Sequence, residues 1–174
     1  MSILRVVGRY FRGFAYGYRG LDRYPEQHAF IASIADENLS LGVTGLGVDS
    51  LMDQWFLYTD LFHVHESVLF STEILTTSES GGPSSGTVVK CMSESRGMLT
   101  RRGVDTVFPH ANHDPALLLR ALGRPIRIPL LFHLYFNDTG RFVRHDVEGW
   151  MACRVVDSIH SRSTNINVAA CLMC

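Results

Sequence analysis

Three polar side chains near the C-terminal end of the chain have the types and spacing that acid–base chemistry requires. His145, Asp146 and Glu148 fall within 141–156, which we expect to be the last strand. A carboxylate buried in a pocket has a raised pKa and can act as a general acid or base. The sequence shows no nucleophile–base pair or cofactor-binding motif beside them. A polar strand edge is therefore the favoured interpretation, and no cofactor is expected.

Two histidines separated by one residue raise the question of a metal site. His63 and His65 would point to the same face of a strand, with Glu66 on the other face. His110 and His113 are more distant candidates. Since no third ligand stands at a diagnostic spacing, the sequence predicts no metal centre.

Two other motifs suggest phosphate binding and prenylation, but each has a simpler interpretation. The Gly-x-x-Gly-x-Gly pattern of 42–47 precedes a helical segment but follows no strand of a βαβ unit, so we expect a loop rather than a phosphate site. The last four residues fit a prenylation box with its thiol at Cys171. Because the final residue, Cys174, is not among the usual ones, prenylation of Cys171 is the less favoured interpretation.

Composition bounds the class of protein that carries these motifs. The chain has 174 residues, 46% of them hydrophobic and 19% charged, with a formal net charge of −1. These values predict one folded domain, 1–157, and a Ser/Asn-rich disordered tail, 158–174. The sequence lacks a membrane-length apolar run and a regular cysteine pattern, and its charge disfavours direct nucleic-acid binding. We therefore expect an intracellular protein, cytoplasmic or nuclear, that binds neither membranes nor nucleic acid.

Arginines are concentrated at the N-terminus. Lys90 is the only lysine among the 16 basic residues. The arginines that precede position 24 are Arg5, Arg9, Arg12, Arg19 and Arg23. At about 100° per residue the first four of them lie opposite an apolar stripe, as expected of a surface helix packed on a sheet. A mitochondrial presequence shares this pattern but is the less favoured interpretation.

The apolar pattern changes its period along the chain. Segments with helical periodicity come first, at 3–18, 25–38 and 49–62. Segments with the alternation of strands follow, at 64–74, 87–100, 126–136 and 141–156, with a short helix at 115–122. Helices followed by an antiparallel sheet define an α+β fold.

The last hairpin decides which polar residues face inward. A two-residue loop at Asp138–Thr139 would place Phe132 opposite His145. A three-residue loop, with Gly140 in the left-handed conformation, would place Phe132 opposite Asp146. Hydrophobic pairing favours the first loop and turn chemistry the second. We lean towards the second, in which both carboxylates of the strand face inward.

Several short stretches, in order along residues 10–150, carry a family resemblance. They are Tyr10–Arg12, Gly47–Leu51 with Gln54–Trp55, Tyr58 and Phe62, then Val107–His110, Leu122–Arg124 and Asp138–Arg141. The chain resembles the nuclear transport factor 2-like, SnoaL-like cone fold. More specifically, it resembles the domain C-terminal to the leucine zipper in oomycete bZIP-type proteins. No basic region or leucine heptad is present, so the DNA binding of such proteins is not expected here.

The resemblance implies three N-terminal helices packed on a strongly curved, mixed, mostly antiparallel sheet. It also implies a pocket between the helices and the concave face of the sheet. The side chains expected to line it are Phe14, Tyr18, Trp55, Tyr58, Leu130, Phe132 and Leu134.

Two functions are compatible with such a domain. The favoured one is a non-enzymatic domain that forms a homodimer and binds a small apolar ligand or a protein partner, including a bZIP-type relative. The alternative is a SnoaL-like small-molecule isomerase, dehydratase or cyclase. In that case Tyr16, Trp55 or Tyr58 would shape the pocket, and the polar residues of the last strand would move protons.

Overall fold

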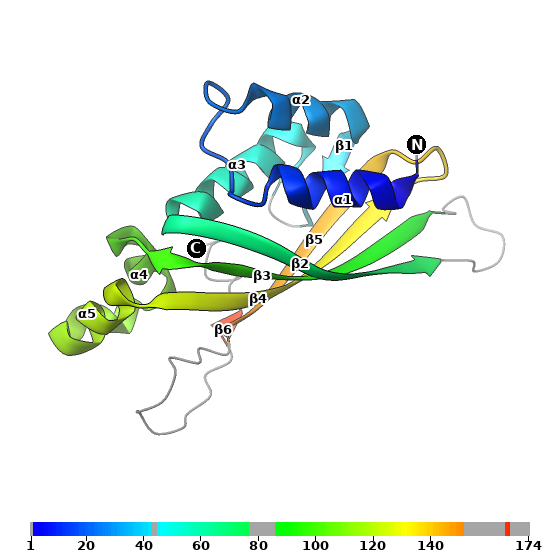
Figure 1. The fold of residues 1–174 in the computed structure, drawn as a ribbon. Helices are drawn as coiled ribbons and strands as arrows, with labels where there is room; N and C mark the ends of the chain where they lie inside the picture. The colour runs from blue at the N-terminus through cyan, green and yellow to red at the C-terminus, as the bar shows by residue number, and fades with distance from the viewer. Residues whose placement is uncertain (1, 43–44, 77–85, 152–165, 168–174) are drawn as a thin grey trace.

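The structure, a computed structural model that describes residues 2–42, 45–76, 86–151 and 166–167, begins with three helices. They are α1 (Ile3–Gly13), α2 (Pro25–Ile34) and α3 (Gly47–Asp60), and they lie on one face of a sheet (Figure 1). Pro25 occupies the first turn of α2, where an N–H group would lack a partner in any case. The first helix ends at Gly13 rather than at residue 18, because the chain turns through Gly17, which has a φ of 79°.

The sheet has the strand order β1-β5-β4-β3-β2. These strands are β1 (Ala35–Ser40), β2 (Phe62–Thr76), β3 (Thr87–Leu99), β4 (Pro125–Phe136) and β5 (Phe142–Met151). Among the strands of the described residues, only β1 runs parallel to its neighbour, β5, which confirms the mixed, mostly antiparallel sheet. Figure 1 shows β2 and β3 curving beneath the helices.

The end of β5 pairs with a short strand, β6 (Ile166–Asn167), within the segment expected to be a disordered tail. The other positions of 158–174, Cys171 among them, lie outside the described residues.

Short helices close one end of the sheet (Figure 1). They are α4 (Arg101–Val107), the 3₁₀ helix η1 (Pro109–His113) and α5 (Pro115–Gly123). Thr100 caps α4 by accepting a hydrogen bond from the N–H of Gly103, and Asp114 caps α5 by accepting from two backbone N–H groups. The apolar pattern predicts α5 but not α4, which is too short for periodicity to reveal.

Two apolar clusters hold the layers together. The larger one lies between the three N-terminal helices and the sheet, and includes Phe14, Trp55 and Phe132. The smaller one joins α4 to the ends of β3 and β4, through Val104 and Ile128 among others. None of the described helices combines the length and apolarity that crossing a bilayer requires.

Candidate functional site

A chain of three polar groups crosses the larger apolar cluster. The hydroxyl of Tyr10 on α1 accepts a hydrogen bond from Nε1 of Trp55 on α3, at 2.7 Å. The same hydroxyl lies 2.9 Å from Nε2 of His145 on β5. All three side chains are buried. We call Tyr10, Trp55 and His145 the tyrosine–histidine network. It links two helices to the central part of the sheet.

Burial keeps the tyrosine–histidine network neutral. It raises the pKa of Tyr10 far above its ordinary value and lowers the pKa of His145 from 6.5 to about 4. A neutral His145 can accept the Tyr10 hydroxyl proton at Nε2, while that oxygen accepts from Trp55. Its Nδ1 is then a buried donor for which the described part of the chain offers no acceptor.

A second polar group of side chains lies on the same face of the sheet. It consists of His65 and Ser67 on β2 with Ser93 and Ser95 on β3, all buried. We call these four residues the serine–histidine cluster. Nε2 of His65 lies 3.3 Å from Oγ of Ser95. Among the described residues, Nδ1 of His65 and the hydroxyls of Ser67 and Ser93 have no hydrogen-bond partner.

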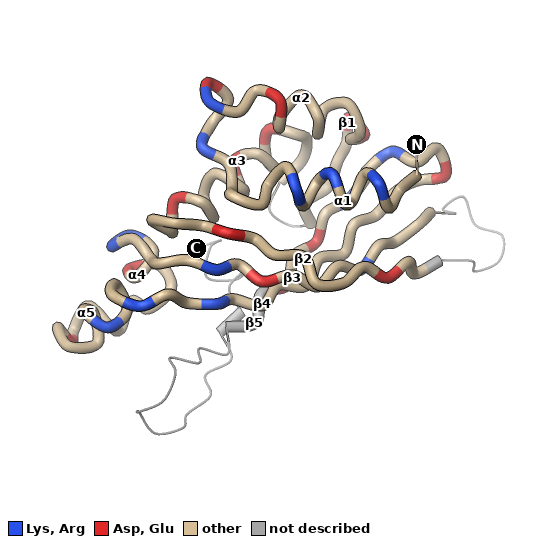
Figure 2. Tube along the Cα trace, viewed as in Figure 1, with Lys and Arg blue, Asp and Glu red and all other residues tan. Residues whose placement is uncertain are grey.

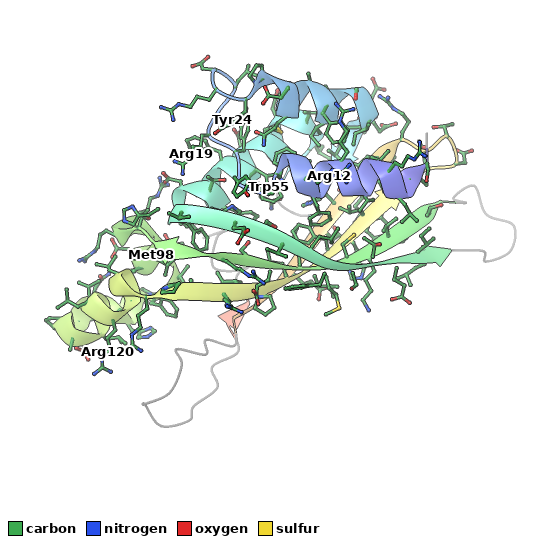
Figure 3. The ribbon with its side chains drawn as sticks, viewed as in Figure 1. Arg12, Arg19, Tyr24, Trp55, Met98 and Arg120 are labelled. Atoms are coloured by element: carbon green, nitrogen blue, oxygen red, sulfur yellow. The ribbon has the colours of Figure 1, made fainter. Side chains whose placement is uncertain are left out.

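Trp55 connects the two polar groups. Its ring centroid lies 6.3 Å from that of His65 and 6.0 Å from that of Tyr10. Figure 3 shows Trp55 on the side of the sheet that the helices cover. Desolvation, with a smaller contribution from the Arg19 charge, lowers the pKa of His65 from 6.5 to about 4. The tyrosine–histidine network and the serine–histidine cluster therefore offer neutral hydrogen-bonding groups, which suit a polar uncharged ligand group better than an ion.

The expected inward orientation of the carboxylates is wrong. His145 faces the helices, whereas Asp146 and Glu148 lie on the outer face of the sheet. Asp146 pairs there with Arg144 at 2.9 Å, and Glu148 is exposed. Of the three candidate acid–base residues, only His145 thus reaches the interior.

A bulge in β5 is the reason for this difference. The turn is the three-residue loop that the sequence favours, with Gly140 at a φ of 77° and the N–H of Asn137 bonded to the carbonyl of Arg141. Beyond the turn, Phe136 pairs with Phe142, but the next pair is Tyr135 with Arg144. One extra residue in β5 reverses the faces of all residues that follow it.

The side chains expected to line a pocket are mostly core residues. Phe14 stacks on Trp55 with ring centroids 4.9 Å apart, and Phe132 meets the edge of Phe11 at 5.2 Å. Leu134 and Tyr18 are buried, while Tyr58 and Leu130 are half-buried. Aromatic rings thus fill much of the space between α1, α3 and the sheet. The role of these residues in a pocket stays a prediction.

The histidines considered as metal ligands lie in different surroundings. His65 is buried, whereas His63 is exposed, next to an irregularity in the β2–β3 pairing. His110 and His113 are exposed on η1. Across the ranges that the structure describes, no group of three His, Cys, Asp or Glu side chains is placed to hold a metal ion.

Comparison with known proteins shows which family models and solved structures this chain resembles. Residues 4–61, which span α1 to α3, match the family model of the BZIP transcription factor 1 C-terminal domain. No curated protein matches the chain. The solved structures that resemble it include a protein assigned as a SnoaL-like polyketide cyclase from Jannaschia sp. CCS1, with a TM-score of 0.52, 11% identity and 84% of each chain covered.

Two further solved structures have the same architecture. A protein assigned as a scytalone dehydratase from Novosphingobium aromaticivorans DSM 12444 has a TM-score of 0.50 and 12% identity, covering 94% of this chain and 89% of its own. An NTF2-like protein of unknown function from Exiguobacterium sp. 255-15 has a TM-score of 0.50 and 9% identity, covering 82% and 95%. The chain therefore has the NTF2-like, SnoaL-like fold, and the resemblance seen in its sequence is confirmed.

Sequence reasoning missed Tyr10 and the buried serines as site residues. Ser93 and Ser95 stand at odd positions of β3, in line with the buried Val89 and Cys91, so alternation could have assigned them to the inner face. Tyr10 lies on the apolar stripe of α1. Its polar partners come from α3 and β5, and only the fold reveals them.

Proposed function

We propose that this chain is a non-enzymatic domain that forms a homodimer and binds protein partners, related to domains of bZIP transcription factors. The observation that carries this proposal is a row of apolar side chains across the outer face of the sheet. This face is opposite the one that the three N-terminal helices cover (Figure 1).

The row crosses three strands. Met92 on β3 is 54% exposed and pairs with Leu131 on β4, which is half-buried. Phe70 on β2 is 57% exposed and lies beneath the guanidinium of Arg96, another outer residue, at 5.8 Å. We call Phe70, Met92 and Leu131 the outer row. Several exposed apolar side chains on one face of a folded domain favour an interaction site.

Charged residues of both signs flank the outer row. On one side Glu94 lies 2.6 Å from Arg96 and 4.0 Å from Arg127. On the other side Lys90 pairs across the strands with His133, and His133 with Asp146. An apolar centre with a polar rim of both signs is typical of protein interfaces, and it can face a second copy of itself around a two-fold axis.

The buried groups of the site support a role other than proton transfer. A general acid or base works best with a pKa near the working pH. The pKa values of His65 and His145 are about 4, and that of Tyr10 is raised far above its ordinary value. At neutral pH these groups neither gain nor release a proton readily. The network and the cluster are therefore interpreted as parts that position the helices on the sheet.

Sedimentation velocity of the full chain tests this proposal. We expect a dimer at tens of micromolar for the wild type and a monomer for Met92→Glu, because the charge would be buried in the centre of the interface. Leu119→Glu, at a 71% exposed position of α5 away from the outer face, is the matched control and should remain a dimer. A monomeric wild type, or a Met92→Glu dimer of undiminished affinity, would contradict the proposal.

A SnoaL-like isomerase, dehydratase or cyclase is the second candidate function, and the serine–histidine cluster is the observation that favours it. A ligand carbonyl or hydroxyl could satisfy the unpartnered groups of His65, Ser67 and Ser93 if the cover above them opens. A small molecule that copurifies with the wild type and is lost from Ser93→Val would support this candidate. His65→Gln should then lose it as well.

A further inference from the structure

We infer that the exposed face of α1 is a docking surface for an acidic, amphipathic helical segment of a partner protein. Arg5, Arg9 and Arg12 all lie on this face and are exposed. At about 100° per residue they fall within one narrow arc, and at 1.5 Å per residue Arg5 and Arg12 are separated by about 10 Å along the axis. We call these three residues the arginine row. Figure 2 shows blue, basic positions along α1.

No carboxylate neutralises the arginine row within the described chain. Arginines elsewhere do have such partners: Arg102 on α4 lies 2.7 Å from Asp60, and Arg144 on β5 lies 2.9 Å from Asp146. The arginine row takes part in none of the ion pairs among the described residues, and α1 contains no acidic residue. The Arg9 guanidinium lies over the ring of Phe30, 4.5 Å from its centroid. The charge of the arginine row is thus available to a partner.

Arg5 stands at a position of α1 where a positive charge is unfavourable. Arg5 stands in the first turn of α1, where the positive end of the helix dipole disfavours a cation. Neither an acidic side chain in this turn nor a side-chain cap from Ser2 offsets it. A residue that conflicts with its local surroundings, without compensation in the fold, favours a role in binding.

The neighbouring side chains favour a helix over an extended polyanion. Leu4 is 46% exposed beside the row, which provides an apolar contact that a phosphate backbone would not use. Gly13, at the end of α1, is exposed, and a Cβ built there would have no neighbour within 4 Å, so a partner helix can approach this end of the face. Carboxylates spaced like the arginines, with an apolar residue to meet Leu4, would complement this face.

The inference does not depend on the proposed dimer. The arginine row lies on the helical layer, whereas the outer row lies on the opposite face of the sheet (Figure 1). A partner can therefore bind α1 whether or not two copies associate through the sheet.

Fluorescence anisotropy with the full chain tests the inference. The probe is a labelled helical peptide of about 14 residues with glutamates at i, i+4 and i+7 and leucines beside them. Shuffled peptide of the same composition and a random duplex DNA of about 20 base pairs serve as comparison probes. We expect the patterned peptide to bind, and the double substitution Arg5→Glu, Arg12→Glu to weaken it by about tenfold or more, since two attractions become repulsions.

The matched control is Arg120→Glu, Arg124→Glu, which makes the same change in net charge at exposed positions. Figure 3 shows Arg120 at the opposite end of the molecule from Arg12. The control should leave the affinity within about twofold of the wild type. Equal loss in both variants, equal binding of the shuffled peptide, tighter binding of the duplex, or no binding of the patterned peptide would each overturn the inference.

Discussion

Lowering the pH should destabilise the fold through two buried histidines, His65 and His145. Both have a pKa of about 4 in the folded chain, against 6.5 when unfolded. Above pH 6.5 both states are neutral and no effect arises. Between pH 6.5 and 4 the unfolded state binds more protons than the folded state, so the free energy of unfolding decreases as the pH falls. At pH 5 the linkage relation gives a loss of about 2 kcal/mol per histidine, roughly 4 kcal/mol in total.

Urea denaturation at pH 7.5 and 5.0, at one protein concentration, measures this loss. Because the stability of a typical domain is about 5 to 15 kcal/mol, the decrease should be large. His65→Gln should remove about half of the pH-dependent difference. His113→Gln, at an exposed position, is the control and should leave it intact. A difference below about 1 kcal/mol in the wild type, or an unchanged difference in His65→Gln, would refute the reasoning.

Two substitutions test the contacts that hold the layers together, each by chemical denaturation at pH 7.5. Tyr10→Phe leaves Nε1 of Trp55 and Nε2 of His145 without their shared partner. It should lower the free energy of unfolding by about 2 to 4 kcal/mol. A decrease below about 0.5 kcal/mol would show that the network contributes little to stability. Gly97→Ala should cost about 2 kcal/mol or more, because a Cβ there would lie 1.9 Å from the carbonyl oxygen of Val64; an unchanged midpoint would contradict this close approach of β2 and β3.

The class of fold could be predicted because long elements repeat one period many times. In α3 the apolar positions recur over fourteen residues, and in β4 alternation places Ile128, Phe132 and Leu134 on the buried face. Because the apolar period repeats many times in such elements, a single exceptional residue does not hide it. In α4, with seven residues, the period repeats too few times to be recognised, so this helix is visible only in the structure.

The orientation of the site residues could not be predicted, because a single residue decides it. The turn at Gly140 was inferred correctly from its chemistry, yet the bulge near Val143 shifts the register by one residue. The shift buries His145, packs the half-buried Val147 against the core, and moves the Asp146 carboxylate to the solvent side. Hydrophobic pairing in the sequence favours His145 on the inner face, whereas the turn chemistry favours Asp146 there. The bulge satisfies both signals, and the local sequence does not reveal a bulge.

The tyrosine–histidine network was missed for a different reason. Its members are separated by 45 and 135 positions along the chain, and each has an ordinary role when taken alone. From the sequence alone, Tyr10 is expected to pack with the apolar residues of α1, and Trp55 to be a core residue of α3. Their hydrogen bonds follow only from the way in which both helices cross β5.

A native mass spectrum of the purified chain, compared with its denatured mass, tests the central claim most directly. A homodimeric domain that binds protein partners predicts a species of twice the denatured mass, 19.5 kDa per chain, with no additional bound compound. A monomer would contradict association through the outer row. A species that carries a small molecule on every chain would contradict a domain that binds only protein partners, and would point to ligand binding or catalysis at the serine–histidine cluster instead.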